Sequence, residues 1–249
     1  MSSNIALQLY SIKELAEKNF LGTLKNVAEI GYNGVEFAGF FKTSAKELHK
    51  TLQDLNLKAS GSHVGIEALN ANVGELIEYS LEIGSPYLIC AWLPEDMRNS
   101  ADAYKRTGEL FNQIGSKCKD SGIKFAFHNH GAEFDKFDGE FGLDLLAANT
   151  QKDLLLFELD TFWVEYRGLK SVDFIHKYGE RCALLHIKDM KSLEEKVNTE
   201  IGKGIMDFKK IIAAGKQYGV EWYTVEQEEF KIPQLQSIRE SYEYLKEIV

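Results

Sequence analysis

Carboxylates and histidines recur in the second half of the chain, each set directly after a short apolar run. The sets are His128-Asn129-His130 with Glu133 just beyond, Glu158-Leu159-Asp160, His186-Ile187-Lys188 and Glu226-Gln227-Glu228. Side chains of these types bind divalent metal ions and exchange protons in catalysis. Burying so many ionisable groups is costly unless they are paired or hold a cation, so their clustering indicates a metal site.

Alternate residues of a strand share a face, so we expect the side chains to point the same way in three pairs: His128 and His130, Glu158 and Asp160, and His186 and Lys188. Asp160, His186, Glu226 and a residue of the 128–133 segment would form a mixed oxygen and nitrogen set. Such a set suits Mn²⁺, Mg²⁺, Co²⁺ or a catalytic Zn²⁺. Each residue alone is better explained as a helix cap or an ion-pair partner, but together they favour one divalent metal ion.

The elements that must position these sets are repeated βα units, because short β-rich runs alternate with longer amphipathic runs along the chain. The eight predicted strands cover residues 5–10, 34–38, 58–63, 86–92, 124–130, 154–160, 183–188 and 222–226. Eight units in 249 residues match the usual size of a closed barrel. We therefore predict an α/β fold, a (β/α)8 TIM barrel forming a single domain over residues 1–249. All four sets then lie at the C-terminal ends of strands, where barrel active sites occur.

Helix stop signals agree with this reading. Helices are predicted over residues 21–30, 45–55 and 104–120, and the first and third end at or near Gly31 and Gly122. A doubly wound open sheet is the alternative fold. The chain lacks a Gly-x-Gly-x-x-Gly motif after the first strand, and the count of eight units favours closure.

Composition excludes several classes of protein. The chain is 44% hydrophobic and 27% charged, as in soluble globular proteins, and it has no apolar run of the roughly 20 residues that a membrane helix needs. We expect a cytoplasmic protein with no membrane partner. The net charge of −9 disfavours nucleic-acid binding. The three cysteines lack Cys-x-x-Cys spacing and are expected to be reduced packing residues.

Six motifs make the chain resemble the xylose isomerase-like TIM barrel family, which includes sugar isomerases, ketose 3-epimerases, inosose dehydratase and apurinic-site endonuclease relatives. The motifs are Gly34-Val-Glu-Phe-Ala-Gly39, His128-Asn-His-Gly-Ala-Glu-Phe134, Glu158-Leu-Asp-Thr-Phe-Trp163, His186-Ile-Lys-Asp189, Ile201-Gly-Lys-Gly-Ile-Met-Asp207 and Val225-Glu-Gln-Glu228. The resemblance covers essentially the full length. The motifs are specific for the superfamily and much less so for a reaction.

In the isomerase and epimerase branch, the resemblance implies a metal held by a glutamate, an aspartate, a histidine and a glutamate from the fifth to the eighth strand. Three positions match, namely Asp160, His186 and Glu226. The fifth strand departs, because His128 and His130 stand where many relatives have Glu-x-His. Either His128 is the ligand, or Glu133 folds back to replace the missing carboxylate.

The same departure leaves open which residues act as the acid and the base. Epimerases that resemble this chain use the fifth- and eighth-strand glutamates as opposed acid and base, a role that Glu133 and Glu226 would fill. If Glu133 is outside the site, His128 or His130 becomes the candidate, because imidazole titrates near neutrality.

Further residues near the strand ends are candidate substrate contacts. They are Glu36, His63, Trp92, Trp163, Arg167 and Lys188. The two tryptophans would stack on the C–H faces of a sugar, and core packing is the competing reading. Glu158 is compatible with a buried pair with Lys188, and Lys188 either contacts substrate oxygens or neutralises the carboxylates.

These observations lead to a metal-dependent sugar or polyol isomerase or epimerase that moves a proton next to a carbonyl, without a nucleotide cofactor. The alternative is a dehydratase or lyase that eliminates water or a glycosidic oxygen from an inosose or a 3-keto-glycoside. Phosphodiester hydrolysis is disfavoured by the small number of histidines and the acidic charge, and nothing favours a non-catalytic binding protein. The expected partner is a small sugar, ketose or cyclitol, and the resemblance is compatible with a homo-oligomer.

Overall fold

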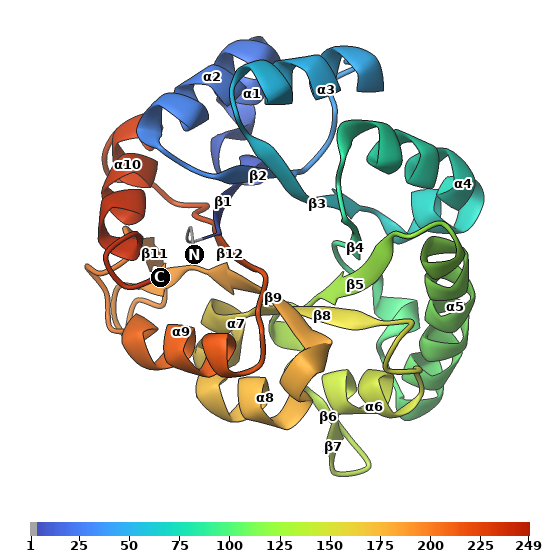
Figure 1. The fold of residues 1–249 in the computed structure, drawn as a ribbon. Coiled ribbons are helices and arrows are strands. Elements are labelled where there is room, and N and C mark those ends of the chain that lie inside the picture. The colour runs from blue at the N-terminus through green and yellow to red at the C-terminus, as the bar shows by residue number, and fades with distance from the viewer. Residues whose placement is uncertain (1–3) are drawn as a thin grey trace.

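The computed structural model describes residues 4–249, in which eight parallel strands close into a barrel (Figure 1). The strands are β1 (Ile5–Gln8), β2 (Gly34–Phe37), β3 (Lys58–Val64), β4 (Tyr87–Cys90), β5 (Lys124–His128), β8 (Leu156–Asp160), β9 (Cys182–Ile187) and β12 (Trp222–Val225). They follow one another around the barrel in chain order, and β12 pairs with β1 to close it. The predicted barrel and the order of its eight strands are confirmed, and the open sheet is excluded. The strands predicted to end at residues 10, 92 and 130 end earlier, at Gln8, Cys90 and His128, so His130 lies beyond its strand.

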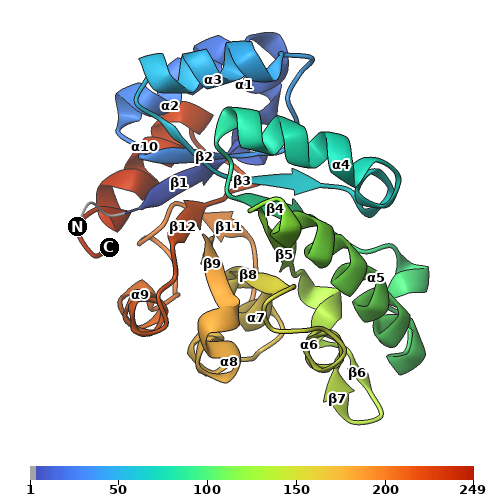
Figure 2. The same ribbon diagram turned by 45° about the vertical axis from the view of Figure 1, so that its right-hand side comes forward.

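Helices form an outer ring around the strands (Figures 1 and 2). They are α1 (Lys13–Lys18), α2 (Phe20–Ile30), α3 (Ala45–Asp54), α4 (Ile66–Ile83), α5 (Ala101–Asp120), α6 (Gly142–Ala148), α7 (Thr161–Tyr166), α8 (Ser171–Tyr178), α9 (Phe208–Gln217) and α10 (Gln234–Leu245). Helix α2 ends at Gly31, whose φ of 117° suits glycine. Helix α5 begins earlier than predicted because the Ser100 hydroxyl accepts the N–H of Ala103 and caps it.

Two short antiparallel hairpins stand at the rim that carries the C-terminal strand ends. One pairs β6 (Lys136–Phe137) with β7 (Glu140–Phe141) after β5, and the other pairs β10 (Asp189–Met190) with β11 (Asn198–Thr199) after β9. Neither was predicted. Within residues 4–249, no helix is both long and apolar enough to cross a membrane.

Apolar side chains fill the lower barrel and leave its upper layer to polar residues. The interior cluster comprises Ala6, Tyr87, Ile89, Ala126, Ala183, Leu184 and Trp222. Two residues further along their strands stand Gln8, His128 and His186, which face the same interior because side chains alternate. A larger apolar cluster packs the strands against the helices. The three cysteines are buried and unpaired, as expected. The polar residues of the barrel interior named here therefore lie at the C-terminal ends of the strands.

Candidate metal centre and active site

Strand pairing brings the chemical residues of neighbouring strands level with one another. His128 of β5 pairs with Glu158 of β8, and Asp160 of β8 pairs with His186 of β9. Glu226 directly follows β12, and its N–H extends the ladder by donating to a β9 carbonyl at 3.1 Å. All five residues are buried at the C-terminal end of the barrel.

Four of these side chains form what we call the upper group: His128, Asp160, His186 and Glu226. One ligand atom of each lies within 4.8 Å of the other three. His128 Nε2 is 3.9 Å from Asp160 Oδ2, and His186 Nδ1 is 3.0 Å from Glu226 Oε2. Two ligands that each lie about 2.1 Å from one ion are at most about 4.2 Å apart. Small side-chain movements would therefore close the group on a divalent ion.

One carboxylate oxygen of Asp160, which accepts no hydrogen bond from residues 4–249, supports that fit. Asp160 Oδ2 is buried and accepts no hydrogen bond from residues 4–249, whereas Oδ1 accepts the Trp163 N–H at 3.1 Å. The Asn129 side chain fixes this backbone by accepting the Asp160 N–H at 3.0 Å. A buried carboxylate oxygen without a hydrogen bond is costly, and a bound metal ion would satisfy it more directly than the Lys188 ammonium 3.4 Å away. Two imidazole nitrogens and two carboxylate oxygens suit zinc and manganese.

Lys188 places a positive charge beside the same carboxylates. Its Nζ is 2.9 Å from Glu226 Oε2, 3.4 Å from Asp160 Oδ2 and 2.8 Å from Glu228 Oε1. The lysine is 1% exposed, whereas the Glu228 side chain is 43% exposed. Lys188 therefore neutralises the upper carboxylates in the metal-free chain, and Glu228 offers its ammonium a partner nearer to solvent.

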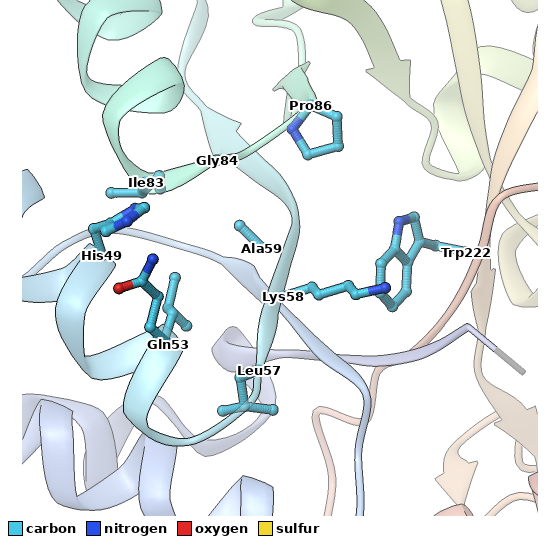
Figure 3. Close-up of a pocket in the computed structure, with 10 residues that line it drawn as sticks. His49, Gln53, Leu57, Lys58, Ala59, Ile83, Gly84, Pro86 and Trp222 are labelled. Carbon is cyan, nitrogen blue, oxygen red and sulfur yellow. The ribbon is translucent and has the colours of Figure 1, made fainter. Parts of the chain in front are cut away.

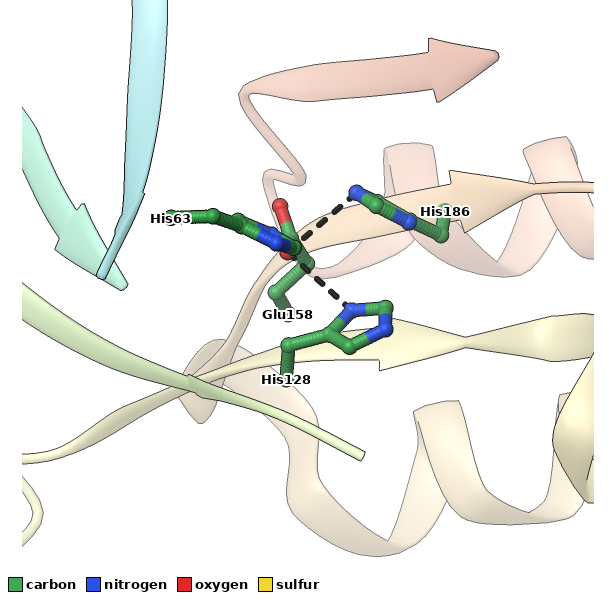
Figure 4. A group of neighbouring side chains, drawn as sticks. All are labelled: His63, His128, Glu158 and His186. Carbon is green, nitrogen blue, oxygen red and sulfur yellow. Dashed lines mark hydrogen bonds and ion pairs between the residues drawn. The ribbon is translucent and has the colours of Figure 1, made fainter. Parts of the chain in front are cut away.

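A second set, here called the deeper group, shares two histidines with the upper group: His63, His128, Glu158 and His186. Figure 4 shows the three rings gathered around the Glu158 carboxylate. Glu158 Oε2 is 2.6 Å from His63 Nε2, 3.2 Å from His128 Nδ1 and 3.2 Å from His186 Nε2. Glu158 is buried, and of the alternatives left open for it the pair with Lys188 is not formed, because the carboxylate contacts imidazoles.

Glu36 orients His186 from the far side of the barrel. Glu36 Oε1 is 2.7 Å from His186 Nε2 and 3.1 Å from His63 Nε2, and it accepts the Gln8 side-chain amide at 2.6 Å. His186 therefore meets Glu226 through Nδ1 and Glu36 through Nε2. A carboxylate on the second nitrogen is the usual partner of a metal-binding histidine and fixes its ring.

Local irregularities in the strands position the two deep glutamates. The register shifts between Val35 and Glu36 in the β2–β3 pairing, and between Phe157 and Glu158 in the β8–β9 pairing. Such shifts re-aim side chains near active sites. Gly61 of β3 also makes room, because a Cβ there would lie 2.6 Å from a neighbouring isoleucine and 3.4 Å from Glu36 Oε2.

Buried carboxylates determine the protonation of two histidines. Burial lowers the pKa of His63, but Glu36 and Glu158 outweigh it and raise the pKa to about 10. Burial also lowers the pKa of His186, and Glu158, Glu36 and Glu226 outweigh it and raise the pKa well above its usual value. Both rings are therefore cationic at neutral pH in the metal-free chain.

The other two histidines are neutral. Burial and the His186 cation hold the pKa of His128 well below its usual value, and burial and Lys188 lower the pKa of His130 to about 4. Burial raises the pKa of Glu226, but Lys188 and His186 outweigh it and hold the pKa well below the usual range. A neutral imidazole can bind a metal or accept a proton at pH 7.

A cleft of about 410 Å³ opens onto these residues from the C-terminal end. Its walls are Tyr10, Ala38, His63, Gly65, Ala91, Trp92, His128, His130, Glu226 and Glu228. Of the predicted substrate contacts, His63 and Trp92 line it, and Trp92 is 47% exposed. Trp163 packs against the His130 ring with centroids 5.8 Å apart and lies outside the lining. Glu36 and Lys188 are buried and are not among the wall residues.

Two predicted residues lie apart from both groups. Glu133 belongs to the 3-10 turn Gly131–Phe134, where its Oε2 accepts the His130 N–H at 2.7 Å. Arg167 pairs with Asp135 on the surface and does not line the cleft. Among residues 4–249, the two groups of potential ligands contain His128 and do not contain Glu133.

Another cavity, of about 280 Å³, opens at the opposite end of the barrel (Figure 3). It is bounded by the first residues of strands, among them Lys58 and Trp222, and by the helix residues His49 and Gln53. In barrels of this kind, residues at the N-terminal ends of the strands serve stability rather than chemistry. The active-site candidate is therefore the cleft above the two groups.

Sequence reasoning missed several residues of the site. Gln8 supports Glu36, Tyr10 lines the cleft, and Asn129 holds the backbone of Asp160. Gln8 and Tyr10 fall at the end of the first predicted strand, so the rule applied to the later strands would have found them. The structural role of Asn129 has no signal in the sequence beyond its place between two histidines.

Comparison with known proteins agrees with the fold. The family model described as xylose isomerase-like TIM barrel matches residues 24–248. An inosose dehydratase of Clostridium beijerinckii is 22% identical over 250 residues, covering 86% of this chain and 83% of that protein. An inosose dehydratase of Geobacillus kaustophilus is 21% identical over 190 residues, covering 68% of this chain and 61% of that protein.

Solved structures are similar over nearly the whole chain. A sugar phosphate isomerase/epimerase from Parabacteroides distasonis superposes with a TM-score of 0.83 at 25% identity, covering 99% of this chain and 94% of that one. The IolI protein with a bound zinc atom superposes with a TM-score of 0.78 at 14% identity, covering 99% and 98%. At this identity, the second similarity concerns the fold alone.

Proposed function

Because the chain belongs to the xylose isomerase-like TIM barrel family, we propose that it is a divalent-metal-dependent lyase acting on a sugar or cyclitol ketone. The reaction removes a proton next to the carbonyl and expels an oxygen substituent from the neighbouring carbon, as in a dehydratase. The similarity to inosose dehydratases is in keeping with this class.

One observation carries the choice of elimination over epimerisation. An epimerase of this kind needs two opposed carboxylates, and here the fifth strand presents His128 to the upper group while Glu133 accepts a hydrogen bond within its own turn. The cleft wall carries the imidazoles of His63, His128 and His130, whereas its two carboxylates, Glu226 and Glu228, both follow β12. An asymmetric site of this kind suits a reaction that removes a proton at one carbon and releases an oxygen at the next.

The residues of the upper group would hold the metal through His128 Nε2, Asp160 Oδ2, His186 Nδ1 and Glu226 Oε2. The IolI protein, which has the same fold, binds a zinc atom, and this supports a metal ion as the cofactor. When bound, the ion would polarise the substrate carbonyl and stabilise the negative charge that develops on its oxygen.

The neutral ring of His130, which lines the cleft, accepts the proton from carbon. The cationic ring of His63, also in the cleft wall, returns a proton to the departing oxygen. The substrate thereby loses one C–H bond and one C–O bond and gains a carbon–carbon double bond, with water or an alcohol as the second product. Trp92 forms the apolar wall on which the ring rests.

Isomerase or epimerase chemistry is the second candidate, and the properties of Glu133 support it. Burial raises the pKa of this carboxyl, which favours a role in proton transfer. Glu133 also lines a cavity that shares His130 with the catalytic cleft. In this reaction Glu133 would have to leave its turn and stand opposite Glu226.

Proton NMR in D2O distinguishes the two reactions. The metal-loaded protein is incubated with ketoses, inososes and 3-keto-glycosides, alongside Asp160→Ala, His130→Asn and Glu133→Gln variants, with the exposed His176→Asn as the control. We expect an unsaturated ketone product, lost in Asp160→Ala and slowed about 100-fold or more in His130→Asn. Deuterium uptake without loss of a substituent, abolished by Glu133→Gln, would instead establish epimerase or isomerase chemistry.

A further inference from the structure

The catalytic cleft borders a neighbouring cavity of about 290 Å³. Trp92 and His130 stand between the two, because both line each of them. The second cavity is completed by Leu93, Arg98, Ala132 and Glu133. Each volume lies near the lower end of the roughly 300–1,000 Å³ range of ligand sites. One ring-sized group fits each cavity, with the indole of Trp92 as the shared wall.

The polar groups of this second cavity are held in place and retain bonding capacity. Arg98 Nε donates to the Leu93 carbonyl at 2.8 Å, and its terminal nitrogens have no hydrogen-bond partner among residues 4–249. Glu133 is 2% exposed; its Oε2 accepts the His130 N–H at 2.7 Å, and Oε1 has no partner among the same residues. A fixed donor and a fixed acceptor therefore share one small cavity.

This pairing selects for hydroxyl groups rather than for an anion. A sugar hydroxyl both donates and accepts, so it can bond to the guanidinium and to the carboxylate at once. A phosphate would gain from Arg98 but would be repelled by Glu133 in the same cavity. The half-exposed indole of Trp92 offers the apolar face on which a sugar ring stacks.

We propose that the cavity lined by Trp92, Arg98 and Glu133 is a second subsite, which binds an uncharged hydroxylated ring attached to the reacting ring. The substrate class is then a neutral glycoside with two rings, and the second ring leaves as the alcohol. The inference rests on the proposed lyase function for the identity of the leaving group, and on the cavity alone for binding.

Binding of unoxidised sugars tests the subsite without any reaction. Dissociation constants are measured by calorimetry and tryptophan fluorescence for methyl β-D-glucopyranoside, for cellobiose, maltose and trehalose, and for glucose 6-phosphate. We expect at least one disaccharide to bind tenfold or more tightly than the one-ring glycoside. Arg98→Gln and Glu133→Gln should each remove that gain and leave the affinity for methyl β-D-glucopyranoside within twofold.

Matched controls are Arg106→Gln and Glu109→Gln, two exposed positions of α5 that should bind every probe as the parent does. Circular dichroism verifies that each variant is folded, and Arg98→Lys serves if Arg98→Gln is not. The proposal is overturned if no disaccharide gains over the one-ring glycoside. It is also overturned if glucose 6-phosphate shows the gain and Glu133→Gln strengthens it, because the cavity would then bind anions. If disaccharides bind with this gain but 3-keto-glycosides undergo no elimination in the NMR assay, the lyase function is refuted and the subsite stands.

Discussion

Replacing Glu36 by glutamine perturbs the deeper group with the least change of shape. Glu36 is fully buried and lies between two imidazoles that are cationic in the metal-free chain, with Oε1 2.7 Å from His186 and 3.1 Å from His63. Removing one partner of a buried ion pair costs about 3–5 kcal/mol. The glutamine can still accept one hydrogen bond, so we expect about 3 kcal/mol of lost stability.

The same substitution should weaken metal binding. Glu36 accepts from His186 Nε2 and thereby directs Nδ1 towards Glu226 and the upper group. Loss of such a supporting carboxylate typically lowers metal affinity by about 10–100-fold. For Glu36→Gln, with the amide oxygen still present, we expect about tenfold.

Two assays separate these effects. Urea unfolding with a chelator present measures stability, and competition with a chromophoric chelator measures zinc affinity. Glu29→Gln is the matched control, because this carboxylate is 60% exposed and its nearest cation, Lys25, is 3.8 Å away. Unchanged stability in Glu36→Gln would refute the charged network. Unchanged zinc affinity in a destabilised variant would refute the role of Glu36 in orienting His186.

Three further predictions follow from the site and the fold. His186 is protonated without metal, so zinc binding should release about one proton and strengthen as pH rises, which calorimetry in buffers of different ionisation enthalpy measures. Lys188→Met should bind zinc at least about tenfold more tightly by chelator competition, because it removes a buried cation from the ligand carboxylates; equal affinity would show that Lys188 already lies clear of the ion. Gly115→Ala should destabilise the chain by about 1–3 kcal/mol in urea, because its Cβ would lie 2.1 Å from the Leu154 carbonyl. Gly74→Ala, in open space on α4, should instead be neutral or stabilising by up to about 1 kcal/mol, and equal effects at the two glycines would contradict the packing of α5.

The barrel was predictable because its signal is repeated eight times. Each strand is a short apolar run followed by an amphipathic helix, and an error in one unit does not change the count. The hairpins β6–β7 and β10–β11 were not predictable, because their strands have two residues each and no period can be read from them. The start of α5 was misplaced because the cap at Ser100 lies outside the apolar pattern.

The upper group was predictable in part. Asp160, His186 and Glu226 come together because the ends of parallel strands meet at one rim, and the alternation of side chains assigns their face. The partners of the deeper group were not predictable, because register shifts at Glu36 and Glu158 change which residues meet across the strands. A bulge of this kind leaves no mark in composition or periodicity.

Glu133 illustrates how a local hydrogen bond competes with a distant site. It lies three positions after His130, which is the spacing at which a side chain can accept the backbone N–H that opens a turn. The sequence offers both that local partner and the upper group. In the structure Glu133 accepts the His130 N–H, and the proposed fifth-strand ligand is His128.

Anomalous diffraction from crystals loaded with zinc tests the central claim most directly. Data collected on both sides of the zinc absorption edge locate the ion independently of any assumed ligand. We predict one strong peak at bonding distance from His128 Nε2, Asp160 Oδ2, His186 Nδ1 and Glu226 Oε2. A peak held by His63 and Glu158, a peak bound by Glu133, or no peak at the upper group would contradict the account.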